Sequence, residues 1–201
     1  MDTTRTGAPG LRERKKEQTR AALSWAALRL CVENGFGNVK VEDIATEAGV
    51  SPRTYNNYFS SKAEAIAWRH LDRARRAADL IRERPADEPV WDAVTAAVLA
   101  NVGSNSKPDP DWAAGVRLMM SEPALQGELP KAYAAANETW AAAIAERVGA
   151  GPDDAYPRIA AAAIGVAAQV ASERWMTADP PVPLPTLLRE ALDHLGAGLA
   201  R

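Results

Sequence analysis

Apolar residues recur every three or four positions along most of the chain, which is the spacing of amphipathic helices and not the alternation of β-strands. Between residues 11 and 34, Leu23, Ala27 and Leu30 follow this spacing, and Gly35 ends the segment. Further helices are predicted over residues 61–83, 90–102, 110–120, 123–148, 154–177 and 185–200. Breaks rich in Gly, Pro, Ser and Asp separate several of them. The pattern therefore predicts an all-α protein.

Residues 41–59 predict two short helices joined by a tight turn. Ile44 lies on the apolar face of the first helix, and Gly49 can adopt the positive φ that ends it. Ser51 is a predicted N-cap of the second helix. Pro52 occupies its first helical position, where a missing N–H leaves no bond unmade. Two short helices with this turn define a helix-turn-helix.

The charge of the chain is unevenly distributed. The 201 residues carry a formal net charge of −2, but residues 1–70 contain eleven Lys or Arg against eight Asp or Glu. This asymmetry predicts that only the first part of the chain meets a polyanion. Residues 1–10 lack the apolar stretch of a signal peptide, and no apolar run reaches the roughly 20 residues of a membrane span. We therefore expect a cytoplasmic protein with no membrane partner and a disordered arm over residues 1–10.

The second short helix is predicted to lie in the major groove of double-stranded DNA, where each base pair presents a distinct pattern of donors and acceptors. Tyr55 and Phe59 are four residues apart and are expected to pack inward. The residues left on the groove side are Pro52, Arg53, Asn56 and Asn57. Arg53 can bind O6 and N7 of guanine, and Asn56 can bind N6 and N7 of adenine.

Lys40 and Thr54 are predicted to donate to DNA phosphates, contacts that fix register rather than sequence. The alternative for Asn56 and Asn57 is that both are ordinary surface amides, although their place in a helix-turn-helix favours DNA contact. A rival function is that of a helical binding protein whose helix-turn-helix has lost DNA binding. The basic residues of the first helix argue against this rival.

The segment VEDIATEAGVSPRTYNNYFSSKAEAI, residues 41–66, resembles the DNA-binding signature of the TetR family of transcriptional regulators. The shared features are an Ile-Ala pair, a Gly-Val-Ser turn, a Thr-aromatic pair, a terminal Phe and a Ser-Lys opening of the next helix. With the first helix, the resemblance covers about residues 12–66. It implies base contacts by Pro52 and Asn56, and phosphate contacts by Asn57, Tyr58 and Lys62.

The chain departs from the pattern of the family at two places. Lys40 stands where Thr or Ser usually precedes the second helix, which keeps affinity for phosphate but removes an N-cap. The run Asn56-Asn57-Tyr58 stands where the family often has two aromatic residues and His. Because amides replace rings there, the operator is expected to differ from those of commoner members.

The remainder of the chain resembles the body of actinobacterial regulators of the mycofactocin-associated group, in segments such as DEPVWDAV and DPDWAAGVRLMMSEPALQGEL. The resemblance implies a homodimeric repressor that binds a pseudo-palindromic operator and is released by a small apolar or acyl-bearing effector, with acyl-CoA as a candidate. It also implies an N-terminal three-helix DNA-binding domain over residues 11–60 and a C-terminal helical ligand-binding and dimerisation domain over residues 61–201.

In TetR-like bodies, helices four to eight surround an apolar effector cavity. The residues predicted to line it here are Trp112, Arg117, Met119, Met120, Trp140, Gln169 and Trp175, with Glu173 as a further polar candidate. The alternative for the Trp residues is core packing, which is favoured for Trp25. The small and apolar residues of the last two helices, especially within 160–171 and 187–199, are implied to pack against a second copy as a four-helix bundle, and an intrachain Ala-rich core is the alternative.

No arrangement of residues predicts an enzyme, a cofactor or a metal ion. His70 and His194 are the only histidines and are far apart, and Cys31 is the only cysteine, interpreted as a buried hydrophobe. The chain has no G-x-S-x-G motif, no P-loop and no paired-carboxylate pattern. We therefore expect neither catalytic residues nor metal ligands.

Overall fold

The computed structural model of the chain describes residues 10–102 and 110–198, apart from the side chains of residues 110–112. The described residues form helices and turns without any β-strand, which confirms the all-α class. They divide into two compact units, one ending at Arg69 and the other beginning at His70. The division lies inside helix α4 (Lys62–Glu83), whereas the sequence predicted a boundary just before this helix.

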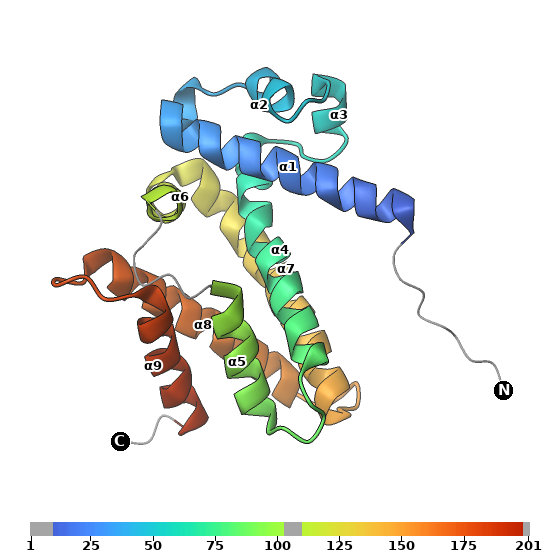
Figure 1. Cartoon of the computed structure of the whole chain (residues 1–201), viewed down its shortest axis with the longest axis vertical. Coiled ribbons are helices and arrows are strands. Elements are labelled where there is room, and N and C mark those ends of the chain that lie inside the picture. Colours follow the sequence, from blue (N-terminus) through green and yellow to red (C-terminus); the bar gives the residue numbers. More distant parts are fainter. Residues whose placement is uncertain (1–9, 103–109, 199–201) are drawn as a thin grey trace. The chain divides into compact units, whose positions relative to one another are not determined.

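The first unit contains a long helix followed by short elements (Figure 1). These are α1 (Leu11–Asn34), the 3-10 helix η1 (Phe36–Asn38), α2 (Val41–Glu47), α3 (Pro52–Asn56) and the first part of α4. Leu23, Ile44 and Tyr55 are fully buried, so α1, α2 and α3 share one core. Ser24 Oγ donates to the carbonyl oxygen of Ala65 at 2.6 Å, which ties α1 to the start of α4.

The turn between α2 and α3 has the chemistry that the sequence predicts. Gly49 has a φ of +69°, a left-handed conformation that glycine adopts without steric strain. Ser51 Oγ accepts a hydrogen bond from the N–H of Thr54 at 3.1 Å and so caps α3. At the start of α2, the N–H of Lys40 donates to Asp43 Oδ2 at 2.8 Å. Because a lysine side chain has no acceptor, only this half of a capping box forms.

The second unit contains the rest of α4 and the later helices. These are α5 (Val90–Val102), α6 (Pro110–Ser121), α7 (Pro123–Val148), α8 (Tyr156–Thr177) and α9 (Leu184–Gly196). Helix α8 packs against both α7 and α9, and α5 packs against α9 (Figure 1). Trp91 Nε1 donates to the carbonyl oxygen of Leu192 at 3.1 Å. A Cβ added at Gly196 would lie 2.5 Å from this nitrogen, so glycine permits the close approach of α5 and α9.

Several small residues of α8 face the interior of their own unit. Ala160 and Ala167 are buried in its core, so the prediction that they pack against a second copy is wrong and the intrachain alternative holds for them. Ile159, Val166 and Val170 lie away from this buried face and are 65%, 58% and 43% exposed. The exposed residues of α8 therefore include three larger apolar side chains beside polar and charged ones.

Trp25 does not pack in the core as the sequence predicted. Its side chain is 56% exposed, and the guanidinium of Arg69 lies 3.4 Å from the centre of its ring. Trp25 is two residues from both Leu23 and Ala27, which are buried, and a step of two residues turns an α-helix by about 200°. It therefore points away from the buried face of α1 and forms a cation–π contact instead.

Arg147, near the end of α7, holds the connection between α4 and α5. Its guanidinium donates to the carbonyl oxygens of Ile81, Arg84, Pro85 and Glu88, three of them at 3.5, 3.2 and 2.8 Å, and lies 3.9 Å from the carboxylate of Glu88. The side chain is only 8% exposed. Carbonyls at a helix C-terminus have no partner within the helix, so one buried cation satisfies groups that would otherwise be left unbonded.

Replacing Arg147 with Met should lower the free energy of unfolding by about 2–4 kcal/mol, because it leaves several partly buried carbonyl oxygens without their donor, whereas the Glu88 carboxylate keeps its hydrogen bonds from Arg84. Urea denaturation followed by circular dichroism measures this loss. Arg158→Met, at an exposed position of α8, is the matched control and should stay within about 0.5 kcal/mol of the parent. Equal shifts of the two midpoints would contradict the assigned role of Arg147.

Candidate DNA interface and ligand cavity

Helix α3 has one buried face and one exposed face. Tyr55 is fully buried, its hydroxyl donates to the carbonyl oxygen of Ser61 at 2.9 Å, and burial raises its pKa. Phe59 is 2% exposed and lies beside Tyr55, with ring centres 6.0 Å apart. The exposed residues are Pro52, Arg53, Asn56 and Asn57. The structure thus gives α3 the orientation that the spacing predicts, with a face of one cation and two amides open to a ligand.

Two of the predicted phosphate contacts lie beside this face and are partly buried. Thr54 Oγ1 lies 2.9 Å from Ser51 Oγ and so belongs to the cap of α3. The ring of Tyr58 lies 5.8 Å from the guanidinium of Arg20 on α1. Lys40 is exposed at the start of α2. These positions leave the two hydroxyls and the Lys40 ammonium on the same unit as the exposed face of α3.

Lys62 has a structural role that sequence reasoning missed. Its ammonium donates to the carbonyl oxygen of Val39 at 2.8 Å and to that of Phe36, and it lies 4.3 Å from the centre of the Phe36 ring. These contacts fasten the start of α4 to the segment between α1 and α2. An ammonium has three donors, so one remains for a phosphate.

The second unit encloses a cavity of about 520 Å³. Its apolar wall includes Val98, Val116, Met119, Leu129, Trp140 and Leu188, which come from α5, α6, α7 and α9. Trp140 Nε1 donates to the carbonyl oxygen of Ala74 at 3.1 Å, so the ring is fixed in the wall. A largely apolar cavity of this size suits a small organic molecule.

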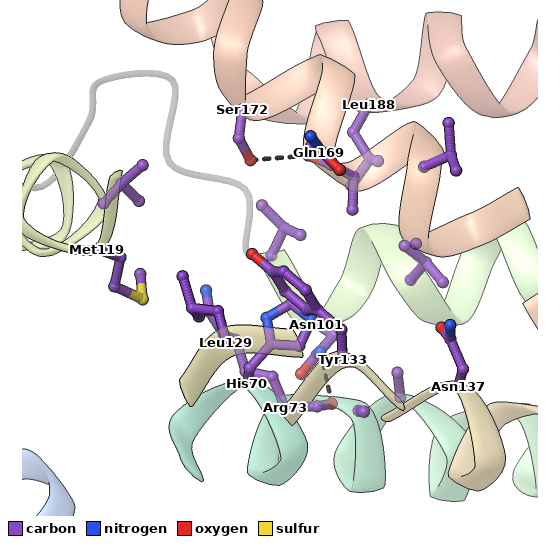
Figure 2. A pocket seen from close by; sticks show the side chains of 18 of the residues that line it. His70, Arg73, Asn101, Met119, Leu129, Tyr133, Asn137, Gln169, Ser172 and Leu188 are labelled. Atoms are coloured by element: carbon purple, nitrogen blue, oxygen red, sulfur yellow. Dashed lines mark hydrogen bonds between the residues drawn. The ribbon is translucent and has the colours of Figure 1, made fainter. Parts of the chain in front are cut away.

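One wall of the cavity is polar (Figure 2). It is formed by His70 and Arg73 of α4, Asn101 of α5 and Tyr133 of α7. The rings of His70 and Tyr133 meet edge to face with centres 4.4 Å apart. Burial, with a smaller effect of Arg73, lowers the pKa of His70 to about 4, so this imidazole is neutral at physiological pH. Asn101 Nδ2 donates to the carbonyl oxygen of Arg73 at 2.9 Å and joins α5 to α4.

The side of the cavity formed by α8 carries a second, smaller polar group. Gln169 Nε2 donates to Glu173 Oε1 at 2.9 Å, and Ser172 Oγ donates to the carbonyl oxygen of Ala168 at 2.8 Å. Figure 2 shows Gln169 and Ser172 away from the Arg73 wall. The polar groups of α8 therefore bond to each other or to their own helix.

The residues predicted to bind a ligand have several different positions. Met119, Met120, Trp140 and Gln169 line the cavity, as does Glu173. Arg117 is exposed and Trp175 is buried in the core, and neither lines this cavity, which corrects their prediction as lining residues. The side chain of Trp112 lies outside the described residues.

Sequence reasoning missed the polar wall. His70 was considered only as a catalytic residue, and Arg73, Asn101 and Tyr133 were not predicted to bind a ligand. A signal for α4 did exist, because His70, Arg73 and Ala77 stand at positions i, i+3 and i+7 of one helix and so share a face. The spacing could not tell whether that face meets a cavity, a packed core or solvent.

Within the described residues, no group of His, Cys, Asp or Glu side chains has the arrangement of a metal site. No helix among them is long and apolar enough to cross a membrane.

Both units match known protein families. Residues 25–66 match the bacterial regulatory proteins of the TetR family, and residues 88–200 match the MftR C-terminal domain. The chain is 33% identical over 193 residues to the mycofactocin biosynthesis transcriptional regulator MftR of Mycobacterium tuberculosis, covering 94% of each chain. It is 34% identical over 176 residues to the HTH-type transcriptional regulator TcmR of Streptomyces glaucescens, covering 83% of this chain and 77% of the relative.

The fold is similar to that of Thermus thermophilus FadR, a TetR-family repressor whose crystal structure contains lauroyl-CoA. The TM-score is 0.55 at 18% identity, and the match covers 90% of this chain and 95% of that chain. The family match over residues 88–200 spans more than half of the chain, and members of this family are transcription factors rather than enzymes. The chain therefore belongs to the TetR family of bacterial transcriptional regulators, with a DNA-binding helix-turn-helix in its first unit.

Proposed function

We propose that this regulator is a cytoplasmic homodimeric repressor, which binds a pseudo-palindromic operator and is released by a small apolar or acyl-bearing molecule in the cavity. The observation that carries the proposal is the combination, in one chain, of an exposed polar face on α3 and a largely apolar cavity of about 520 Å³.

Arg53 and Asn56 are the residues that read bases, together with Pro52. Arg53 forms no ion pair within the described part of the chain, so its planar guanidinium is available to a guanine edge. Lys40, Thr54, Asn57 and Tyr58 contact phosphates and set the register of the helix in the groove. Lys62 adds at most one donor to this set, because two of its three hydrogens bond to carbonyls.

The exposed face of α8 forms the dimer interface. Ile159, Val166 and Val170 recur at spacings of seven and four residues and are all exposed, so they make one apolar stripe on the helix, and Val166 also lines the cavity. An exposed apolar stripe of this kind is typical of a protein–protein contact. A two-fold dimer also matches the requirement that two recognition helices enter half-sites about 34–36 Å apart.

Helix α4 transmits the presence of the effector. It carries Lys62, bonded to the segment before α2, and it carries His70 and Arg73, which line the cavity. A ligand alters DNA affinity only if it binds one arrangement of α4 better than another. The acyl-bearing class is supported by the lauroyl-CoA bound to the Thermus thermophilus relative and by the match to the MftR C-terminal domain.

Substitutions in α3 should separate base contacts from phosphate contacts. Arg53→Ala and Asn56→Ala should each weaken operator binding by about 1–3 kcal/mol and relax the preference at particular base pairs. Lys40→Ala should weaken all sequences alike and reduce the salt dependence by about one phosphate contact. Fluorescence anisotropy with an operator library at several salt concentrations measures both effects. Arg158→Ala, on α8, is the control and should change neither. Identical profiles for Arg53→Ala and Lys40→Ala would contradict these roles.

Placing a charge on the exposed stripe of α8 should break the dimer. Ile159→Glu should raise the dissociation constant of the dimer about 100-fold or more, because an unpaired carboxylate would be buried in an apolar contact. Sedimentation velocity at micromolar concentration measures the species present. Ala142→Glu, at an exposed position of α7, is the control and should remain dimeric. If the unaltered protein is a monomer both alone and on DNA, the dimer proposal is wrong.

An effector should lower operator affinity about 5–150-fold, the range of ordinary allosteric coupling. Anisotropy with a panel of long-chain acyl-CoA esters and planar aromatic compounds measures this change. Met119→Gln should weaken the response, because it places an amide in the apolar wall, while operator affinity without ligand stays unchanged. Val148→Gln, an exposed position outside the cavity, should respond like the parent. A compound that binds without altering operator affinity would contradict the coupling through α4 for that compound.

A further inference from the structure

Arg73 is a cation in the wall of the cavity. Within the part of the chain that the structure describes, no carboxylate forms an ion pair with its guanidinium. The adjacent acid on α4, Asp72, pairs with Arg76 at 2.8 Å instead. Figure 2 shows the side chains nearest to Arg73 in the cavity, which are His70, Asn101 and Tyr133. None of them is acidic.

A buried guanidinium without a counter-ion is unfavourable, because arginine cannot shed its proton at physiological pH and therefore cannot escape the charge. Burial, with a smaller repulsion from Arg76, lowers the pKa of Arg73, which is the signature of a charge that the surroundings destabilise. Arg147 of the same unit is also enclosed, with 8% of its side chain exposed, yet it donates to carbonyl oxygens and lies 3.9 Å from Glu88. Arg73 has no such set of acceptors among the described residues, so its guanidinium is not explained by the fold.

Among the described residues that line the cavity, Arg73 is the one cationic group. His70 is neutral, since its pKa is lowered to about 4, and burial raises the pKa of Tyr133, which keeps its hydroxyl protonated. Glu173 on α8 already accepts from Gln169 at 2.9 Å. Beyond this wall the lining is largely apolar, apart from Gln126, Asn137 and the α8 group of Gln169, Ser172 and Glu173. The arrangement matches a molecule with one anionic end and an apolar body.

We propose that Arg73 binds the carboxylate of the effector, which is therefore a free carboxylic acid with an apolar chain or ring system rather than a neutral compound or an ester. This rests on the proposed function, in which the cavity holds the effector. The guanidinium makes a bidentate pair with the carboxylate, and the neutral imidazole of His70 and the Tyr133 hydroxyl can supply further hydrogen bonds. The apolar body lies against Met119, Leu129 and Val116. The carboxylate supplies the counter-charge that the fold does not.

Matched pairs of probes test the charge directly. Dodecanoate is compared with dodecanol and dodecanoyl-CoA, and 2-naphthoate with 2-naphthylmethanol, by calorimetric titration of the full-length protein. At least one carboxylate should bind about 10–100-fold more tightly than its alcohol. Arg73→Met should remove this preference and leave the affinity for the alcohol unchanged, whereas Arg73→Lys should keep part of it. Arg158→Met, an exposed arginine outside the cavity, should bind all probes like the parent.

The ligand-free proteins give a second, independent measurement. Because Arg73 is buried without a partner, Arg73→Met should raise the midpoint of thermal unfolding, and a carboxylate probe should then stabilise the parent but not the variant. A lowered midpoint for Arg73→Met would mean that the arginine is a structural residue and would overturn the proposal.

The outcomes separate this inference from the proposed function. If the alcohols bind as well as the carboxylates and still lower operator affinity, the carboxylate proposal is wrong and the ligand-released repressor stands. If dodecanoyl-CoA binds through Arg73 and dodecanoate does not, the anion is a phosphate of the ester and the carboxylate proposal is again wrong. If no probe binds, the carboxylate proposal fails, while operator binding by the ligand-free protein still reports on the DNA half of the proposed function.

Discussion

A single uninterrupted helix, α4, contributes to the cores of both compact units, and this is the constraint on which the rest of the structure depends. Ile66 is buried in the first unit and Ile81 in the second, and both are on α4. Because a helix rotates by about 100° per residue, His70, Arg73 and Ala77 share one face of the second part of α4, and this face lines the cavity. The first part of the same helix carries Lys62, whose ammonium bonds to carbonyl oxygens of the first unit.

The two enclosed arginines of the second unit show how differently one side chain can be used. Arg147 satisfies carbonyls at the end of α4 and in the loop that follows, so its charge stabilises a connection that lacks regular hydrogen bonds. Arg73 lies on α4 itself, about three turns before the end of that helix. The backbone carbonyl oxygen of Arg73 accepts a hydrogen bond from Asn101. Its guanidinium has no equivalent set of acceptors among the described residues. In the proposed complex, the carboxylate of the effector offsets the stability that this charge costs the fold.

Local chemistry explains why much of the first unit could be predicted from the sequence. Gly49, Ser51 and Asp43 act within four residues of themselves, through a positive φ or a cap, and such signals are readable in a linear sequence. Tyr55 and Phe59 lie inward because their spacing leaves one face of a short helix apolar. Trp25 was predicted wrongly because its size suggested burial, whereas its angular position on α1 places it outward.

Contacts between distant segments account for what the sequence could not predict. Lys62 bonds to a carbonyl 23 residues away, and no pattern around Lys62 distinguishes that role from a phosphate contact. The cavity is harder still, since Asn101 and Tyr133 become neighbours of Arg73 only when α5 and α7 pack against α4. Trp175 and Met119 looked alike as candidates, yet one fills the core and the other lines the cavity. Apolar side chains with the same spacing can pack in a core or line a cavity. Which of the two occurs depends on the helix that lies opposite them.

The distribution of small and large apolar residues around α8 follows from the way the helices pack. Alanines on the inner face allow α7 and α9 to approach closely, because a methyl group needs little space between two helices. The larger residues Ile159, Val166 and Val170 lie away from this inner face, which besides the alanines carries Ile164 and Trp175. Large apolar side chains exposed on a helix leave more apolar area in water than exposed alanines would. For an isolated chain this exposure is unfavourable. That imbalance is relieved if the outer face is covered by a second copy, which is why the larger residues, and not the alanines, support the proposed dimer.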